Sequence, residues 1–414
     1  MNFTRELINS LENFKNKRAI VLGDIMLDQY LYGEVNRISQ EAPVPIVHFL
    51  EEKYTLGGAG NLAANLVGLG ARVFLTGTVG NDEKGKIILQ LIKNLGMSTE
   101  GIFGDKTKPT IVKQRIVVNK RQLLRVDYED TNIIKKFLAK KIISFIKEKL
   151  NKVDVIAIGD YAKGLIDKSL AGKLINLANS RKIPVVVDTK PKNFDYFAGA
   201  TLIKLNLKEA KEAARLNEEA SIEEIGKALV SRSGSNIFIT QGEKGITVFE
   251  KNGKITHFSA KKAIPIDITG AGDTVCAICA LGIASNFSLS QIAELANVGG
   301  KIVVEKPGTA PLSLNELKEA LMITQPNLLR KKVRKKWGYE DWIVNYEGAN
   351  FCGKRLVIKR GYQCSIHYHK EKCEVFYVNK GFVLMQAYDK EILMKAGDSL
   401  LIEPGTKHRF IGLT

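Results

Sequence analysis

"DITGAGDT" occupies residues 267–274, where two glycines bracket an alanine and an aspartate follows at once. Such a turn can point successive backbone N–H groups at one spot and so bind an anion at the start of a helix. The phosphate-binding loop GxxxxGK[ST] carries a lysine, and this stretch has none. A carboxylate beside an anion hole suits phosphoryl transfer to an alcohol, because the hole binds phosphate charge while the carboxylate takes the hydroxyl proton. From this octapeptide alone, a plain helix N-cap is an equally good interpretation of Asp273.

On the N-terminal side of this stretch, short apolar runs alternate with helical patterns. The apolar runs are AIVLG (19–23), VDVIAIGD (153–160), IPVVVDT (183–189), ATLIKLN (200–206) and NIFITQG (236–242). Helical patterns lie between several of them, as at 132–150 and 169–182. This order predicts a parallel sheet covered by helices, with ligands at the carboxyl ends of its strands.

Two regions depart from this pattern. Residues 24–50 and 110–127 read as short strands with turns, and we expect them to form a small separate sheet that acts as a lid. After residue 326 the character changes, and from Trp337 onward short alternating strands dominate with no helical pattern. We therefore expect an α/β domain over 1–326, a basic linker over 327–336 that contains RKKVRKK, and an all-β domain over 337–414.

The composition restricts the class of protein. The chain has 414 residues, 45% of them hydrophobic, and a formal net charge of +18. It contains no apolar run of 18 residues and no secretion signal, so we expect a cytoplasmic protein that does not span a membrane. Five cysteines in a long chain favour reduced thiols over a disulfide framework. The lysines are dispersed and no nucleic-acid-binding motif is present, which favours phosphorylated small ligands over nucleic acid.

A second glycine-rich stretch is LGGAGNLAANLVGLGARVFLTGTVGNDEKG (56–85), which opens with a glycine pair and Asn61 and continues into a helix. Together with residues 267–274 it resembles the paired signatures of the PfkB family of sugar kinases, over about residues 17–325. The resemblance implies a ribokinase-like, three-layer αβα domain with a mostly parallel central sheet and a small β lid. It also implies ATP as the phosphoryl donor and Mg²⁺ as the accompanying cation.

The resemblance assigns roles by position. It implies that Asp273 is the catalytic base and that Gly270, Ala271 and Gly272 form the anion hole. The sugar contacts that it implies are Asp28 in GDIMLD, Asn61 and the glycine pair Gly57 and Gly58. On the nucleotide and Mg²⁺ side it implies Asn206 and Glu209 of an NxxE motif, Thr240 and Gly242 in TQG, and Asn297 near the adenine.

Three stretches narrow the sugar: GDIMLDQYLYGEVNRISQEAPVPIV (23–47), GDYAKG (159–164) and KPGTAPLS (306–313). They resemble the bacterial D-glycero-β-D-manno-heptose 7-phosphate kinases, which implies phosphorylation of the anomeric O1 to the 1,7-bisphosphate in the biosynthesis of activated heptose for lipopolysaccharide core or surface glycans. A second phosphate on the substrate calls for cations, and Lys190 is the first candidate, followed by Lys113, Arg115 and Arg121 on the lid. A PfkB kinase for another phosphosugar is the alternative.

Two further expectations concern assembly and missing activities. Lids of this family commonly pair between subunits, so we expect a homodimer. The chain has no HxGH motif, the mark of the nucleotidylyltransferase that follows the kinase in bifunctional relatives. We therefore expect that it does not make the nucleotide-activated heptose itself.

A metal site is predicted near the C-terminus, where GYQCSIHYHKEKCEVFYVNKG (361–381) contains HxH and a later glutamate. Residues two apart on a strand face the same side, so His367 and His369 point together, and Glu374 and His408 complete a site suited to Zn²⁺, Fe²⁺, Mn²⁺ or Ni²⁺. The stretch resembles the first motif of the cupin jelly roll, and most of all the cupin of type II phosphomannose isomerases.

Three aspects of this domain stay open. The chain stops six residues after His408, so the expected barrel is C-terminally incomplete. A metal-free cupin whose histidines only pack is the alternative to a metal site. Its role would be that of an isomerase or epimerase, or of a sugar- or metal-sensing and assembly module.

Overall fold

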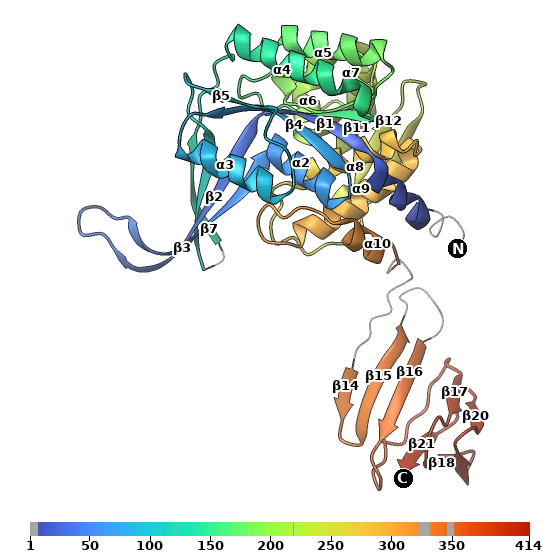
Figure 1. The fold of residues 1–414 in the computed structure, drawn as a ribbon. Helices are drawn as coiled ribbons and strands as arrows, with labels where there is room; N and C mark the ends of the chain where they lie inside the picture. Colours follow the sequence, from blue (N-terminus) through green and yellow to red (C-terminus); the bar gives the residue numbers. More distant parts are fainter. Residues whose placement is uncertain (1–6, 120, 218, 323–331, 346–351) are drawn as a thin grey trace. The chain divides into compact units, whose positions relative to one another are not determined.

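The computed structural model describes residues 7–119, 121–217, 219–322, 332–345 and 352–414. The chain divides into two compact units, Met1–Leu321 and Met322–Thr414. The first unit is α/β and the second is built from strands (Figure 1). No helix among the described residues combines the length and the hydropathy that a bilayer crossing requires.

The centre of the first unit is a nine-stranded sheet. In spatial order its strands are β13 (Ile255–Phe258), β12 (Ile246–Phe249), β11 (Asn236–Thr240), β10 (Leu202–Asn206), β9 (Val185–Asp188), β8 (Val155–Gly159), β1 (Arg18–Gly23), β4 (Arg72–Gly80) and β5 (Ile102–Asp105). The pairs from β11 to β5 are parallel, and β12 and β13 add an antiparallel edge. All five strands that the apolar runs predict are present, and their carboxyl ends meet along one edge.

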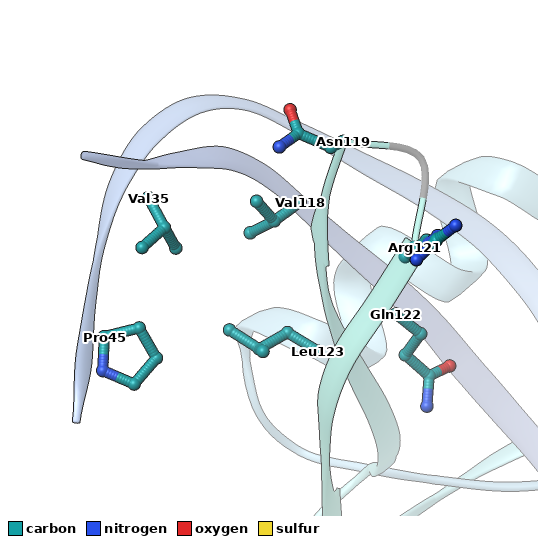
Figure 2. A pocket seen from close by; sticks show the side chains of 7 residues that line it. All are labelled: Val35, Pro45, Val118, Asn119, Arg121, Gln122 and Leu123. Atoms are coloured by element: carbon teal, nitrogen blue, oxygen red, sulfur yellow. The ribbon is translucent and has the colours of Figure 1, made fainter. Parts of the chain in front are cut away.

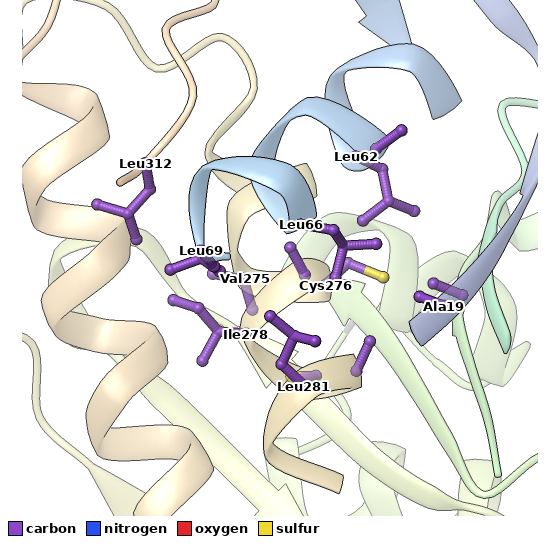
Figure 3. Close-up of a cluster of buried hydrophobic side chains, with 14 of the residues drawn as sticks. Ala19, Leu62, Leu66, Leu69, Val275, Cys276, Ile278, Leu281 and Leu312 are labelled. Atoms are coloured by element: carbon purple, nitrogen blue, oxygen red, sulfur yellow. The ribbon is translucent and has the colours of Figure 1, made fainter. Parts of the chain in front are cut away.

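Helices cover both faces of this sheet, as the alternating pattern predicts. One face carries α2 (Ala59–Gly68), α3 (Glu83–Asn94), α8 (Ala271–Ala284), α9 (Leu289–Val304) and α10 (Leu314–Met322), and the other carries α4 (Lys136–Lys149), α5 (Lys168–Ser180), α6 (Leu207–Ala214) and α7 (Ile222–Ser233) (Figure 1). The hydrophobic core on the face that carries α2 and α8 joins these two helices, and in it Leu62 and Leu66 pack near Cys276 and Ile278 (Figure 3). Burial of Cys276 among these apolar side chains indicates a packing role for this thiol.

The lid is a four-stranded sheet in the order β3-β2-β6-β7. It contains β2 (Ile25–Ile38), β3 (Pro45–Gly58), β6 (Ile111–Val118) and β7 (Arg121–Tyr128). β2 and β3 are each 14 residues long, whereas the sequence predicted short strands with turns. Residues that were expected to form turns are instead part of β2, because register shifts at Tyr32/Gly33 and Val35/Arg37 accommodate them. The two strands therefore stay paired and form an exposed hairpin.

The second unit corrects the predicted linker. Its first sheet has the order β14-β15-β16, formed by β14 (Lys332–Lys335), β15 (Gly338–Asn345) and β16 (Cys352–Ile358). Residues 332–335 of the predicted linker 327–336 are therefore a paired strand, and 327–331 lie outside the described residues. Lysine-rich runs are compatible with edge strands, because backbone pairing does not need apolar side chains and exposed lysines discourage further pairing.

The remaining strands of this unit form two further sheets. β17 (Glu374–Tyr377) pairs with β20 (Ser399–Ile402), and β18 (Phe382–Ala387) lies between β19 (Lys390–Lys395) and β21 (His408–Gly412). A small core includes Met385, Met394 and Phe410, and the ring of Trp337 meets that of Phe410 edge-on at 5.1 Å. The described part of this unit contains no helix, which confirms the all-β prediction.

Candidate active site and candidate metal centre

The loop before α8 has a backbone that only glycine can supply. Gly270 is the N-cap of the helix and has φ +83°, and a Cβ there would lie 2.7 Å from Nδ2 of Asn61. A Cβ on Gly272 would lie 2.8 Å from Nζ of Lys204. The first N–H groups of an α-helix have no partner within the helix, and they carry the positive end of its dipole. The start of α8 can therefore bind an anion.

Asp273 is the third residue of α8, which begins at Ala271. Because Gly270 holds the N-cap position, the interpretation of Asp273 as an N-cap is wrong. Its carboxylate is buried and receives two hydrogen bonds from other elements. Nδ2 of Asn61 on α2 donates to Oδ2 across 2.7 Å, and the hydroxyl of Tyr161, which follows β8, donates to Oδ1.

The surroundings of Asp273 set its proton affinity. Burial, followed by the negative charge of Asp188, raises its pKa to about 6. The hydrogen bonds from Tyr161 and Asn61 and the positive charge of Lys204 act in the opposite direction. Asp273 is therefore ionised at neutral pH and more basic than an exposed aspartate, as a general base requires.

A buried ion pair lies next to the helix start. Nζ of Lys204 on β10 donates to Oδ2 of Asp188 on β9 across 2.7 Å, and both side chains are almost fully buried. Burial would lower the pKa of Lys204, but the charges of Asp188 and Glu209 outweigh it and raise this pKa above its ordinary value. This pair was not predicted from the sequence, although a lysine in the middle of the apolar run ATLIKLN needs a buried anionic partner.

The residues predicted to bind nucleotide and Mg²⁺ lie at the carboxyl ends of neighbouring strands. Asn206 ends β10 directly beside Thr240 at the end of β11, and Gly242 follows with φ +60°. Asn206 and Glu209 form a reciprocal capping box at the start of α6, in which each side chain accepts the other's backbone N–H. The NxxE spacing thus orients the Glu209 carboxylate.

Lys190 and Asn297 have partners that the sequence did not predict. Lys190 was expected near the sugar, but its ammonium pairs with Oε1 of Glu209, which is on the predicted nucleotide side. Asn297 on α9 donates from Nδ2 to the carbonyl of Phe258 across 2.9 Å and so holds the end of β13. Both residues face groups that the local sequence pattern does not reveal.

The predicted sugar residues gather where the lid joins α2. Asp28 on β2 pairs with Arg115 on β6, with Nη1 and Oδ1 2.6 Å apart and both side chains buried. A Cβ on Gly57 would lie 2.8 Å from Oδ2 of Asp28, so only glycine fits beside this carboxylate. Gly58 has φ +57° and directs the chain into α2, which carries Asn61.

The remaining candidate cations differ in position. Lys113 is partly buried, and its pKa is lowered first by burial and then by the charge of Arg125. Arg121 is exposed at the outer end of the lid. Of the sequence candidates on the lid, Lys113 and Arg115 therefore lie near Asp28, and Arg121 does not.

A second buried network supports Tyr161. Asp24 accepts hydrogen bonds from the backbone N–H groups of Tyr161, Lys163 and Leu165 at 2.9, 3.2 and 3.3 Å. Neither Tyr161 nor Asp24 was predicted from the sequence as a site residue. Asp24 could have been found from the sequence, because it directly follows β1 and a carboxylate after a buried strand lies at the edge of the sheet where ligands bind.

The second unit brings together the four residues predicted to bind a metal. One ligand atom from each of His367, His369, Glu374 and His408 lies within 4.8 Å of the others. Backbone pairing of His367 with His408 aligns two of the imidazoles, and Glu374 begins β17. Nε2 of His408 lies 3.1 Å from Oε2 of Glu374, and Nε2 of His369 lies 3.4 Å from the same oxygen.

The donor atoms of this cluster fit a cation. Nδ1 of His367 and Nδ1 of His408 face the carbonyls of Ser365 and Thr406 at 2.9 and 3.0 Å, which places their protons on Nδ1 and leaves Nε2 as a lone-pair donor. Buried Nε2 of His408 and Oε2 of Glu374 have no hydrogen-bond partner. Two lone-pair donors facing each other are stabilised by a cation between them, and three imidazoles with one carboxylate suit a divalent transition metal.

Comparison with known proteins gives two family matches. The pfkB family of carbohydrate kinases matches residues 16–316, and the cupin domain family matches residues 355–414. The bifunctional protein HldE of Geobacter metallireducens is 39% identical over 302 residues, which are 72% of this chain and 62% of that protein. HldE of Helicobacter pylori is 37% identical over 317 residues, which are 76% of this chain and 68% of that protein. The chain thus spans about two thirds of the length of these relatives.

Solved structures share the fold of the first unit. Phosphofructokinase-2 of Escherichia coli, in complex with substrates and products, superposes with a TM-score of 0.61 at 15% identity and covers 74% of this chain and 99% of its own. Ribokinase of Arabidopsis thaliana, with ribose and ATP, gives a TM-score of 0.57 at 17% identity over 74% of this chain and 98% of its own. These likenesses confirm the ribokinase-like fold.

Proposed function

The chain belongs to the pfkB family of carbohydrate kinases, and we propose that it transfers the γ-phosphoryl group of ATP to the anomeric O1 of D-glycero-D-manno-heptose 7-phosphate. The observation that carries this proposal is the position of Asp273. Its buried carboxylate lies in the first turn of α8, next to Gly270 and Gly272, and is held by Asn61 from α2. A base and an anion site within one helical turn suit phosphoryl transfer to a hydroxyl.

The heptose assignment is supported by where three sequence stretches meet. Residues 23–47, 159–164 and 306–313 carry the resemblance to heptose 7-phosphate kinases, and they are far apart in the chain. The first two meet through the bond from Tyr161 N–H to Asp24. The third meets the first at Gly308, where a Cβ would lie 3.4 Å from the hydroxyl oxygen of Tyr30. Stretches that share one site are expected to share one substrate.

The proposed chemistry assigns a task to each group. Asp273 takes the proton of O1 as that oxygen bonds to the γ-phosphorus, and the bond from this phosphorus to the bridging oxygen of ADP breaks. The N–H groups at the start of α8 stabilise the negative charge on the transferring phosphoryl group. Lys204 Nζ and Oδ2 of its partner Asp188 lie 2.8 Å and 3.5 Å from the Cβ position of Gly272, so this ion pair borders the anion site without a net charge of its own.

Glu209 and Asn206 are the residues that would hold Mg²⁺ and its waters. Glu209 fits this role because its partly buried carboxylate is oriented by the capping box and its pKa stays below the ordinary value, since Lys204 and Asn206 outweigh the effect of burial. Because Glu209 also pairs with Lys190, we expect it to contact Mg²⁺ through a water molecule and not to ligate the ion directly. The cation supplies charge neutralisation on the phosphates of ATP.

A substrate screen tests the proposal. Release of ADP is measured with heptose 7-phosphate, fructose 6-phosphate, fructose 1-phosphate and ribose 5-phosphate, and the product is located by phosphorus NMR. We expect the highest kcat/KM with heptose 7-phosphate and a new phosphate at C1. A higher kcat/KM with a different phosphosugar would establish the alternative substrate and refute the heptose assignment.

The second unit is proposed to bind a divalent transition metal through His367, His369, Glu374 and His408. Two roles are compatible with this site, and they predict different results. An isomerase or epimerase would interconvert hexose or heptose phosphates in a metal-dependent way that survives Asp273→Asn. A sensing or assembly module would show no turnover, and its metal or sugar ligand would change the kinase kinetics.

We further propose that two chains pair through their lids. Large apolar side chains on the lid are about half exposed, including Val44, Phe49, Leu50, Leu123 and Leu124. Val35, Pro45, Val118 and Leu123 line an open hollow between the hairpin and β7 (Figure 2). Exposed apolar surface of this extent favours an interface. Light scattering should give a dimer that Phe49→Glu dissociates, whereas Ile133→Glu, an exposed apolar position outside the lid, leaves it intact.

The chain is also proposed to lack nucleotidylyl transfer, because it contains no HxGH motif. The purified protein is therefore expected to stop at the bisphosphate. Formation of a nucleotide-activated heptose by the pure protein would contradict this expectation.

A further inference from the structure

Tyr161 lies in GDYAKG (159–164), a stretch whose individual residues have no role assigned from the sequence. Its hydroxyl donates to Oδ1 of Asp273, while Asn61 donates to Oδ2, so both oxygens of the proposed base have one donor each. Each carboxylate oxygen can accept two hydrogen bonds, so a lone pair remains for an incoming hydroxyl. The arrangement holds the carboxylate in one orientation and leaves it able to accept a proton.

The loop that carries Tyr161 is built around buried carboxylates. Asp24 accepts three backbone N–H groups from residues 161, 163 and 165. Asp160 accepts the N–H of Ala162 and is itself held by Thr189 and Asn193. Ala162 has φ +58°, a left-handed conformation that strains a residue with a side chain. A strained turn fixed on two sides indicates that the orientation of residue 161 is determined by the fold.

The ring of Tyr161 is also held in place. Cε2 of the ring lies 3.4 Å from the Cβ position of Gly159, so the ring rests against the end of β8. Nζ of Lys190, which follows β9, lies 5.7 Å from the centroid of the Tyr161 ring. Burial, followed by the charge of Asp273, raises the pKa of Tyr161 well above its ordinary value, so its hydroxyl stays protonated and donates.

We propose that Tyr161 is a positioning residue for the base: its hydroxyl, fixed by the loop that Asp24 and Asp160 hold, keeps Asp273 ionised and aimed at the acceptor hydroxyl. The inference rests on the proposed function, in which Asp273 is that base. The other charged or titratable groups facing Asp273 are Asp188 on β9, Lys204 on β10 and Cys276 on α8. Tyr161 is the titratable neighbour that donates a hydrogen bond to Asp273, so removal of its hydroxyl changes this contact selectively.

The test is the pH profile of kcat/KM in the full-length chain. The wild type should lose activity as the pH falls through about 6, the pKa of Asp273. We call this fall of kcat/KM on the acidic side of the profile the acid limb. In Tyr161→Phe the buried carboxylate of Asp273 loses a hydrogen-bond donor, so the midpoint of the acid limb should rise by about one pH unit. The loss of rate should therefore be larger at pH 6 than at pH 8. The phosphates of both substrates titrate equally with either enzyme, so the difference between the two profiles reports on the protein.

Tyr196→Phe is the matched control, because Tyr196 packs against the core on the face of the sheet that carries α4–α7, away from Asp273. Its acid limb should coincide with that of the wild type. An unchanged acid limb in a folded Tyr161→Phe protein would overturn the inference. If Tyr161→Phe does not fold, 3-fluorotyrosine at position 161, a stronger donor, should move the limb to lower pH, and a limb at the wild-type position would overturn the inference equally.

Asp273→Asn separates this inference from the proposed function. Near-normal turnover in Asp273→Asn would refute the base assignment and the inference with it. Loss of turnover in Asp273→Asn, together with an unchanged limb in Tyr161→Phe, would refute the role of Tyr161 alone. Carbon-13 NMR of labelled aspartate, with the resonance of residue 273 assigned by its absence in Asp273→Asn, measures the same pKa change without turnover.

Discussion

Asn61 and Asp273 are 212 positions apart in the chain, and Nδ2 of Asn61 donates to Oδ2 of Asp273 across 2.7 Å. This bond joins the first turns of α2 and α8, the two helices whose starts carry the two glycine-rich stretches. A Cβ on Gly270 would collide with the same Asn61 amide. The two stretches therefore meet at one place, where the glycines make room for Asn61, which holds the proposed base.

Replacement of Asp273 by asparagine should remove the base while keeping the shape of the site. We expect turnover to fall by roughly 10²–10⁴-fold, the contribution of a positioned general base. The dissociation constant of ATP should change little, because the N–H groups of α8 and the Asn206–Glu209 capping box are unaffected. Steady-state kinetics and calorimetric titration with ATP measure the two quantities. A rate within a few-fold of the wild type would refute the assignment.

The same substitution should stabilise the protein at neutral pH. The pKa of Asp273 is about 6 in the folded protein and near 3.8 in the unfolded chain, so the folded state binds more protons between these values and loses stability as the pH rises through them. Asp273→Asn removes this loss, and we expect a gain of roughly 1–3 kcal/mol at pH 7.5 that shrinks towards pH 4. Calorimetric unfolding at both pH values measures the gain. Equal stability changes at pH 4 and pH 7.5 would contradict the expectation.

The Asp28–Arg115 pair should control affinity for the sugar. Asp28→Asn keeps the volume but weakens the 2.6 Å contact with Arg115 and removes a charged acceptor for a sugar hydroxyl. We expect kcat/KM for the sugar phosphate to fall by about 10–100-fold, the effect of losing a hydrogen bond to a charged group, with little change in the KM for ATP. Asp195→Asn, on the exposed surface, is the control and should behave as the wild type. An equal loss for both substrates would point to general destabilisation instead.

The four-residue cluster of the second unit should bind about one metal ion per chain. His408→Ala and Glu374→Gln each remove a donor from the cluster, so bound metal measured by mass spectrometry after dialysis should fall by 10-fold or more. His48→Ala, at an exposed position on the lid, should leave the metal content unchanged. Metal content that is equal in all three variants would show that the histidines only pack.

Local sequence patterns were sufficient for the elements of the fold. Each apolar run from AIVLG to NIFITQG became a strand of the central sheet, because a run of buried β-branched residues bounded by turn residues has few other structures available. The positions of the lid strands were predicted from the sequence, but the lengths of β2 and β3 were not. Pairing between two strands continues through bulges, and a bulge leaves no mark in apolar alternation.

The sequence by itself proposed the base and the anion loop, through the resemblance of two glycine-rich stretches, and the four residues of the metal cluster, which the structure brings together. The strand expected to carry His367 and His369 is not formed, and the backbone bridge from His367 to His408 aligns the cluster instead. Only the tertiary structure decided the partners of Asp273, namely Tyr161, Asn61, Asp188 and Lys204, which come from four separate elements. It also paired Lys190 with Glu209, a partner that the sequence did not predict. The physical reason is that a pKa and an ion pair depend on burial and on charges brought together across the sheet, and neither quantity is a property of a local run of residues.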